Sequence, residues 1–140
     1  MAAFQKFNSF VEALAEKKHD LGADTLKVML SNTAPVAANA LKADLTEITA
    51  GNGYAAGGAT AAVTTSAQTA GLYRLVLADP PAWTAAGGGI GPFRYAVLYN
   101  DTAANKELIG WWDYGSAVTL AVGESFAVDF DATTGVLTIQ

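Results

Sequence analysis

The sequence contains no cysteine, and this absence excludes several kinds of chemistry at once. Disulfide stapling, thiolate catalysis and cysteine-ligated zinc all require a thiol. His19 is the only histidine, so the chain also lacks the multi-histidine patterns that bind zinc. We therefore expect neither a zinc centre nor a disulfide framework.

Positive charge is scarce. Eight Lys and Arg residues stand against thirteen Asp and Glu residues, which gives a formal net charge of −5. The basic residues are scattered, and Lys17-Lys18 is the only adjacent pair. Proteins that bind a nucleic-acid backbone do so with clustered Lys and Arg. We therefore expect no nucleic-acid partner.

Long apolar runs are also missing. No stretch approaches the ~18 apolar residues that cross a bilayer, and the opening "MAAFQKFNSF" lacks the apolar segment of a signal peptide. We expect a protein that is made in the cytoplasm and has no membrane contact.

The residues that are present favour one folded domain, residues 1–140, because 51% are hydrophobic and the length suits a single core. The spacing of Ser9 and Glu12 resembles a capping box, and the apolar residues that follow predict a short helix over Phe10–Lys17. We regard residues 1–9 as a candidate extended arm that orders on docking.

Alternating apolar residues predict a mainly β fold after residue 25. Short strands separated by turns favour an antiparallel β-sandwich or jelly-roll with one short N-terminal helix. We expect the last two strands to form a hairpin around 131–135, and residues 31–50 to be either a loop or a weak helix. The predicted strands cover 25–30, 62–65, 72–77, 93–100, 107–115, 117–122, 125–130 and 136–140.

Strict alternation also assigns faces within two of these strands. It places Phe93 with Tyr95, Val97 and Tyr99 on one face of its strand. In the returning strand it places three residues, Leu108, Trp112 and Tyr114, on the face opposite Ile109 and Trp111.

The stretch "GNGYAAGG", Gly51 to Gly58, fits the G-x-G-x-x-G/A pattern of a dinucleotide loop. Such a loop must follow a buried strand and begin a helix. Here the flanking residues predict neither element, so we interpret the glycines as turn residues with positive φ, Gly53 and Gly58 among them. Tyr54 should then bury its ring and hydrogen-bond its hydroxyl.

A search for catalytic groups finds no convincing set. His19 has no neighbouring nucleophile in the sequence, and we interpret it as a solvated or helix-capping side chain. Asp129 and Asp131 share the solvent side of a predicted strand, and calcium binding would need further oxygens, such as those of Asp101. We therefore predict no enzyme activity and no catalytic, cofactor or metal residues.

Aromatic residues are concentrated in the second half of the chain. Trp111 and Trp112 are adjacent, so a regular strand directs them to opposite faces and one can remain available to a neighbour. A ligand-binding platform is the alternative role for exposed aromatics. The candidate interface residues are Phe4, Phe7, Trp111, Trp112 and Tyr114.

An ordered series of motifs adds a resemblance. The stretches "LGADTLKVMLSNTAP", "ITAGNGYAAGG", "FRYAVLYNDT", "LIGWWDYG" and "FAVDFDATTGVLTI" together resemble a family of small virion structural proteins of tailed bacteriophages. Some members of that family resemble capsid cement, or decoration, proteins with a jelly-roll sandwich, and the family has no catalytic residues to carry over.

The resemblance implies a cement protein on the outer surface of the phage head. It would bind the major capsid protein across subunits and associate with itself as a dimer or trimer. The alternative is a tail- or fibre-associated virion protein that contacts host surface glycan.

Overall fold

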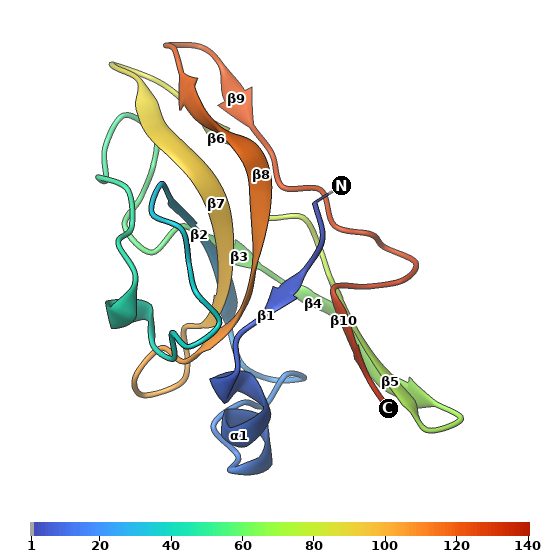
Figure 1. Cartoon of the computed structure of the whole chain (residues 1–140). Coiled ribbons are helices and arrows are strands. Elements are labelled where there is room, and N and C mark those ends of the chain that lie inside the picture. Colours follow the sequence, from blue (N-terminus) through green and yellow to red (C-terminus); the bar gives the residue numbers. More distant parts are fainter. Residues whose placement is uncertain (1) are drawn as a thin grey trace.

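The computed structural model describes residues 2–140 and is mainly β, with antiparallel sheets and one short α-helix, as predicted (Figure 1). The arrangement is consistent with a β-sandwich, and the jelly-roll topology stays a prediction. The elements are β1 (Gln5–Lys6), α1 (Ser9–Ala15), β2 (Leu26–Ser31), the 3₁₀ turn η1 (Lys42–Asp44), β3 (Ala59–Ala61), β4 (Val63–Thr69), β5 (Leu72–Leu77), β6 (Trp83–Thr84), β7 (Ile90–Asn100), β8 (Leu108–Leu120), β9 (Ser125–Phe126) and β10 (Leu137–Ile139).

The body of the protein is a five-stranded sheet with the order β1-β8-β7-β2-β3. A two-stranded β6-β9 pair lies near one end of the long strands β7 and β8 (Figure 1). A separate three-stranded sheet, β10-β5-β4, extends away from this body (Figure 1). Within residues 2–140, no helix is long and apolar enough to cross a membrane.

Both faces of the five-stranded sheet are apolar. Strand β2 directs Leu26, Val28 and Leu30 into the larger core, as predicted, while Met29 joins a smaller core on the opposite face. The smaller core comprises Phe7, Met29, Val97, Tyr99 and Leu108, with Leu45 and Trp111 packed against it. Leu45 belongs to the 31–50 segment, which is mostly loop with the single turn η1.

The described part of the N-terminal segment, residues 2–9, is docked on the body, so the prediction of an extended arm that orders only on docking is wrong for these residues. Strand β1 pairs with β8, and Phe7 is completely buried. Phe4 packs on Trp112 with ring centroids 5.3 Å apart. Burial of two aromatic rings outweighs the chain entropy that a free arm would retain.

Helix α1 begins one residue earlier than predicted and ends two residues earlier. Ser9 is its first residue, and Asn8, the residue before it, makes no side-chain capping bond, so the capping box does not form. Lys17, two residues after the last helical residue Ala15, has a left-handed φ of 63°. The amide of Lys18 donates to the carbonyl of Ala13 over 2.8 Å, which is the 6→1 bond of a Schellman motif.

Irregular pairing between β7 and β8 overturns the predicted faces. Tyr99 pairs with Leu108 and Leu98 with Gly110, so one extra β8 residue, Ile109, lies between these pairs. A bulge of this kind reverses the side-chain alternation beyond it. Leu108 therefore shares the smaller core with Trp111, while Ile109 and Trp112 face the larger core.

Phe93 is affected in the same way. It pairs with Val118, whereas Tyr95 pairs with Asp113, so β8 contributes several extra residues between these pairs. As a result Phe93 is buried in the larger core, away from Val97 and Tyr99.

The predicted C-terminal hairpin does not form. Strand β9 pairs with β6, and β10 pairs with β5, so the two segments belong to different sheets. The turn over 131–135 exists, because the Gly135 amide donates to the Asp131 carbonyl over 3.0 Å. Phe126 and Val128 pack on the larger core and Phe130 is buried within it, which holds 126–130 against the body.

Candidate functional site: an aromatic groove

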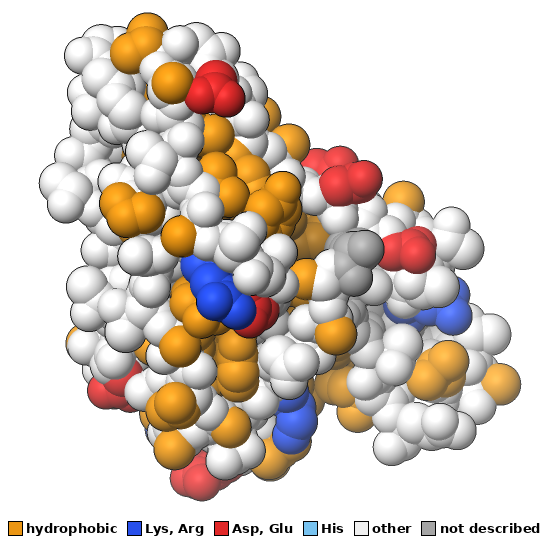
Figure 2. All heavy atoms as spheres, turned by 45° about the horizontal axis from the view of Figure 1, so that its top comes forward, with side chains coloured by type: hydrophobic (Ala, Val, Ile, Leu, Met, Phe, Trp, Pro, Cys, Tyr) orange, Lys and Arg blue, Asp and Glu red, His pale blue; other side chains and the backbone are white. Residues whose placement is uncertain are grey.

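A groove lies between the five-stranded sheet and the segment 126–130, with a volume of about 320 Å³. Its walls are largely aromatic, since Phe93, Trp112, Tyr114, Phe126 and Phe130 all line it. The face shown in Figure 2 has a band of hydrophobic side chains bordered by basic and acidic ones.

The aromatic rings in this groove contact one another. Phe126 meets Phe93 edge-on with centroids 4.9 Å apart, and it meets Tyr114 edge-on at 5.5 Å. Trp112 packs on Phe130 at 5.4 Å. These contacts hold the walls in place before any partner arrives, which reduces the entropy lost on binding.

Tyr114 is the most exposed of these rings, with 58% of its surface accessible. It projects where β8 departs from regular pairing, next to Gly115 with φ of 100°. A regular strand would have continued the ladder at this point, so the bulge places Tyr114 at the groove.

An ion pair forms part of the rim. Arg94 Nε donates to Asp113 Oδ1 over 2.7 Å and Arg94 Nη2 donates to Oδ2 over 3.0 Å, a bidentate arrangement. The guanidinium, together with the amide of Gly115, holds the pKa of Asp113 below its usual range. Arg94, which this pair holds in place, and Asp129 both line the groove and give it a polar border.

The five predicted interface residues divide into three groups. Tyr114 is exposed, as an interface residue must be before its partner binds. Phe4 and Trp111 are half-buried, and Trp111 is covered by Phe7 at a centroid distance of 4.5 Å. Phe7 and Trp112 are buried in the two cores, and for Phe7 the interface prediction is wrong because its ring has no free surface.

Adjacent tryptophans are both accommodated because the sheet has a core on each face. Trp112 is 7% exposed and lines the base of the groove, whereas Trp111 belongs to the smaller core. The sequence did not reveal that Phe93, Phe126 and Phe130 would join Trp112 in one groove. The signal available was their aromatic character alone, because their convergence depends on the bulges and on the path of 126–130.

His19 was expected to be solvated or to cap the helix, but it is buried and its ring contacts Asn100. It is 4% exposed, and its Nδ1 lies 3.0 Å from Asn100 Nδ2. Burial lowers its pKa, against the opposing effect of the Glu107 and Asp24 carboxylates. Its Nε2 and Glu107 Oε2 are buried without a hydrogen-bond partner among the groups of residues 2–140.

The glycine stretch forms a turn, as predicted. Gly51 and Tyr54 exchange two main-chain hydrogen bonds across Asn52 and Gly53, which have φ of 58° and 103°. Positive φ at both central residues is the requirement of a type I′ turn. The ring of Tyr54 is buried, and its hydroxyl donates to Glu47 Oε1 over 2.7 Å.

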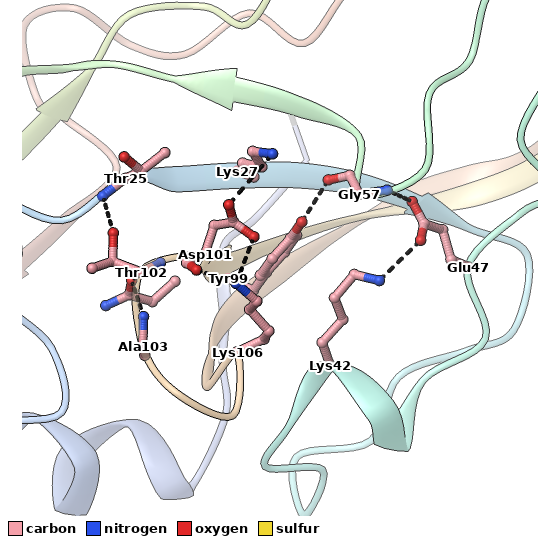
Figure 3. A network of polar contacts seen from close by, with 11 residues as sticks. Thr25, Lys27, Lys42, Glu47, Gly57, Tyr99, Asp101, Thr102, Ala103 and Lys106 are labelled. Atoms are coloured by element: carbon pink, nitrogen blue, oxygen red, sulfur yellow. Dashed lines mark hydrogen bonds and ion pairs between the residues drawn. The ribbon is translucent and has the colours of Figure 1, made fainter.

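A polar network then anchors the second half of that stretch (Figure 3). Glu47 Oε1 accepts the Gly57 amide over 2.6 Å, and the Tyr99 hydroxyl donates to the Gly57 carbonyl over 2.7 Å. Lys42 Nζ pairs with Glu47 Oε2 at 3.0 Å. Burial raises the pKa values of Tyr54 and Tyr99, so both hydroxyls remain neutral donors. The polar groups of this network bond to one another, which indicates a structural role.

A second part of the same view shows the β7–β8 connection (Figure 3). Asp101 pairs with Lys27 at 3.4 Å and with Lys106 at 3.2 Å, and the amide of Thr25 donates to the Thr102 hydroxyl.

No group of three or more potential metal ligands is found within residues 2–140. Asp131 instead accepts the amides of Thr133 and Thr134, which lowers its pKa.

Comparison with known proteins adds no relative. No protein-family model, no curated protein and no solved structure matches this chain. The aromatic groove is therefore interpreted from its own geometry, together with the motif series in the sequence.

Proposed function

We propose that this protein is a capsid cement protein of a tailed bacteriophage, which docks on the outside of the head shell and stabilises it. The ordered motif series supports the virion context. The observation that carries the docking role is the exposed Tyr114 ring at a preformed aromatic groove.

The groove has the features of a protein-binding site. Aromatic side chains that are rigid before binding are typical anchors of protein interfaces, and a polar rim excludes water around them. The proposed occupant is an apolar side chain or loop of the major capsid protein, seated against Trp112 and beside Tyr114. The proposed role is non-catalytic, and copies of the chain would associate on the head surface.

Net charge supports an apolar mode of docking. The chain carries a formal −5, and exposed charges interact weakly beyond about 8 Å at physiological ionic strength. Docking through the groove should therefore depend little on salt.

A rebinding assay tests this proposal. Phage heads stripped of the protein are incubated with purified wild type, Tyr114→Ala or Val122→Ala, and bound protein is measured after sedimentation. Val122 is a matched control because it is 65% exposed and lies outside the groove. We expect at least about tenfold weaker binding for Tyr114→Ala, as for an interface anchor, and wild-type binding for Val122→Ala.

The result that overturns the proposal is equal binding by all three proteins, or a steep loss of binding with added salt. Labelling of intact virions provides the second test. Many copies on the head agree with the cement role, whereas a few copies at the tail favour the second candidate.

That second candidate is a tail-associated protein whose groove binds host glycan. The specific observation in its favour is the combination of the exposed Tyr114 ring with the carboxylate of Asp129 in one groove. Aromatic faces and carboxylates are groups that a sugar ring can use for stacking and hydrogen bonding.

A further inference from the structure

Strand β4 is exposed on both of its faces. Six of its seven residues, Thr64 to Thr69, are exposed, although the strand pairs with β5 along its length. It is the outer strand of the β10-β5-β4 sheet, which extends away from the body (Figure 1). A strand whose side chains are exposed on both faces contributes little to the hydrophobic core. Core packing alone therefore does not explain why this segment is an extended strand.

The outer main-chain edge of β4 has no partner within residues 2–140. Thr69 and Leu72 flank a two-residue turn, Ala70-Gly71, whose φ values of 51° and 83° are those of a hairpin turn. The flanking pair of such a hairpin is hydrogen-bonded, and bonding alternates from there. Ser66 and Gln68 therefore direct their N–H and C=O groups to the open edge, where no main-chain bond is found.

This edge also lacks two of the devices that normally block pairing, namely charged side chains and proline. The sequence of β4, "VTTSAQT", has neither charge nor proline, and the one irregularity lies between Val63 and Thr65, at the base of the strand.

The hairpin is held in an extended shape before any contact. Ser66 Oγ and Tyr73 Oη are 2.8 Å apart, and the Gly71 amide donates to Gln68 Oε1 over 3.0 Å. Preorganisation of this kind reduces the entropy lost when a further strand is added.

The charge distribution indicates which partner fits. Residues 48–78 contain none of the thirteen acidic residues and one basic residue, Arg74. Two copies of a chain with a formal charge of −5 repel each other over most of their surfaces. Their approach is least opposed where carboxylates are few, and β4 itself carries none. Asp20 and Asp24 line a pocket with Ser66, but Lys17 and Lys18 line the same pocket.

We propose that β4 is a self-association edge, on which the β4 strand of a second copy pairs in antiparallel orientation across a two-fold axis. The two three-stranded sheets then form one continuous six-stranded sheet. With Ala67 of the two copies opposite each other, Thr65 of one copy faces Thr69 of the other across the junction, a pairing that stabilises neighbouring strands. This inference concerns the contact between copies, and it stands whether or not the chain docks on a capsid.

Sedimentation equilibrium of the purified chain, without capsid, tests the proposal with two variants. Ala67 and Thr138 both pair with Arg74, from β4 and β10 respectively, and both are exposed. Ala67→Glu and Thr138→Glu therefore add the same charge, on the same sheet face, beside the same arginine. Only Ala67→Glu brings two like charges together at the proposed junction.

We expect a concentration-dependent dimer for the wild type and for Thr138→Glu. We expect dimerisation of Ala67→Glu to be weaker by about fivefold or more, the upper range for unfavourable cross-strand pairs, and to recover partly in high salt. In hydrogen exchange, the amides of Ser66 and Gln68 should slow with rising protein concentration, while those of Ala67 and Thr69 should not change. Thermal melting establishes that both variants fold.

Three results would overturn the proposal. The first is a wild type that remains monomeric up to roughly 0.5 mM, since weak specific contacts are populated at such concentrations. The second is loss of dimer in Thr138→Glu alone, which assigns the contact to β10. The third is protection of all β4 amides alike, which indicates a contact through the sheet face.

Discussion

Asn100, the last residue of β7, donates a side-chain hydrogen bond to Nδ1 of His19 over 3.0 Å, and a second one to Asp24 over 2.6 Å. Its carbonyl oxygen accepts the amides of Thr102 and Ala103, so the amide group has only one consistent orientation. Nδ1 of His19 is therefore an acceptor, and the neutral ring carries its proton on Nε2.

This arrangement predicts that stability depends on pH through His19. Burial lowers its pKa in the folded protein below the ordinary value of 6.5. The unfolded chain then binds the proton more readily than the folded one. The contribution of neutral His19 to the free energy of unfolding is therefore fully present above about pH 6.5, and it falls below that pH by at most ~1.4 kcal/mol per pH unit.

Urea unfolding at several pH values between 5 and 8 measures the effect, with His19→Gln as the comparison. The wild-type midpoint should fall toward pH 5, and the midpoint of the variant should change much less. The aspartates with lowered pKa values, Asp101, Asp113 and Asp131, do not affect this measurement. Their effect on the free energy of unfolding appears only near and below their ordinary pKa of 3.8, which lies outside the range of pH 5 to 8. Parallel curves for the two proteins would contradict the prediction.

Gly110 allows β1 to approach β8. A Cβ atom at this position would lie 2.2 Å from Phe4 Cε2 and 2.6 Å from the Gln5 carbonyl oxygen. Gly110→Ala should therefore displace β1, at a cost of roughly 1–3 kcal/mol, and should speed trypsin cleavage after Lys6. Gly22→Ala is the control, because the nearest atom there is the movable Ser66 Oγ at 3.2 Å. Equal cleavage rates in the two variants would show that β1 is not held in this way.

Replacing each of the two tryptophans by alanine should lower the stability of the protein by different amounts. Trp112 is almost completely buried in the larger core, whereas Trp111 is half-buried against Phe7. Trp112→Ala should cost about 3–5 kcal/mol because it leaves a large cavity, and Trp111→Ala should cost clearly less. Thermal and chemical unfolding of both variants checks the order, and a larger loss for Trp111→Ala would reverse the assignment of cores.

Alanine substitutions at Gly58 and Gly87 distinguish the energetic cost of a positive φ from the cost of a steric clash. Their φ values are 78° and 79°, but an added Cβ would lie 1.8 Å from the Val28 carbonyl oxygen at Gly58 and would meet nothing within 4 Å at Gly87. Gly87→Ala should cost about 1 kcal/mol through its φ alone. Gly58→Ala should cost at least ~1 kcal/mol more, because the β2 backbone must move. Equal losses of unfolding free energy would contradict the role of the Val28 contact.

The sequence by itself determined the secondary structure to a useful extent. Alternating apolar residues and turn residues act locally, so the β class, strands β2, β5 and β7, the short helix and the Gly51–Tyr54 turn could be predicted. The sequence also indicates the position of strand β4, although the predicted strand, 62–65, is shorter than the observed one, Val63–Thr69. The turn could be distinguished from a nucleotide loop because neither a buried strand nor a helix opening flanks it.

Only the tertiary structure decided which faces and strands meet. The bulge at Ile109 reverses alternation along β8, and its position follows from how β7 and β8 fit against two cores. Partner choice for β9 and β10 is likewise non-local, so proximity in sequence wrongly suggested a hairpin. The polar neighbours of His19 in the sequence predict a solvated or helix-capping side chain, yet its ring packs on Phe10 and contacts Asn100, 81 residues away. Local patterns carry conformational preference, whereas burial depends on contacts between distant segments, and these place the aromatic groove and the open edge of β4.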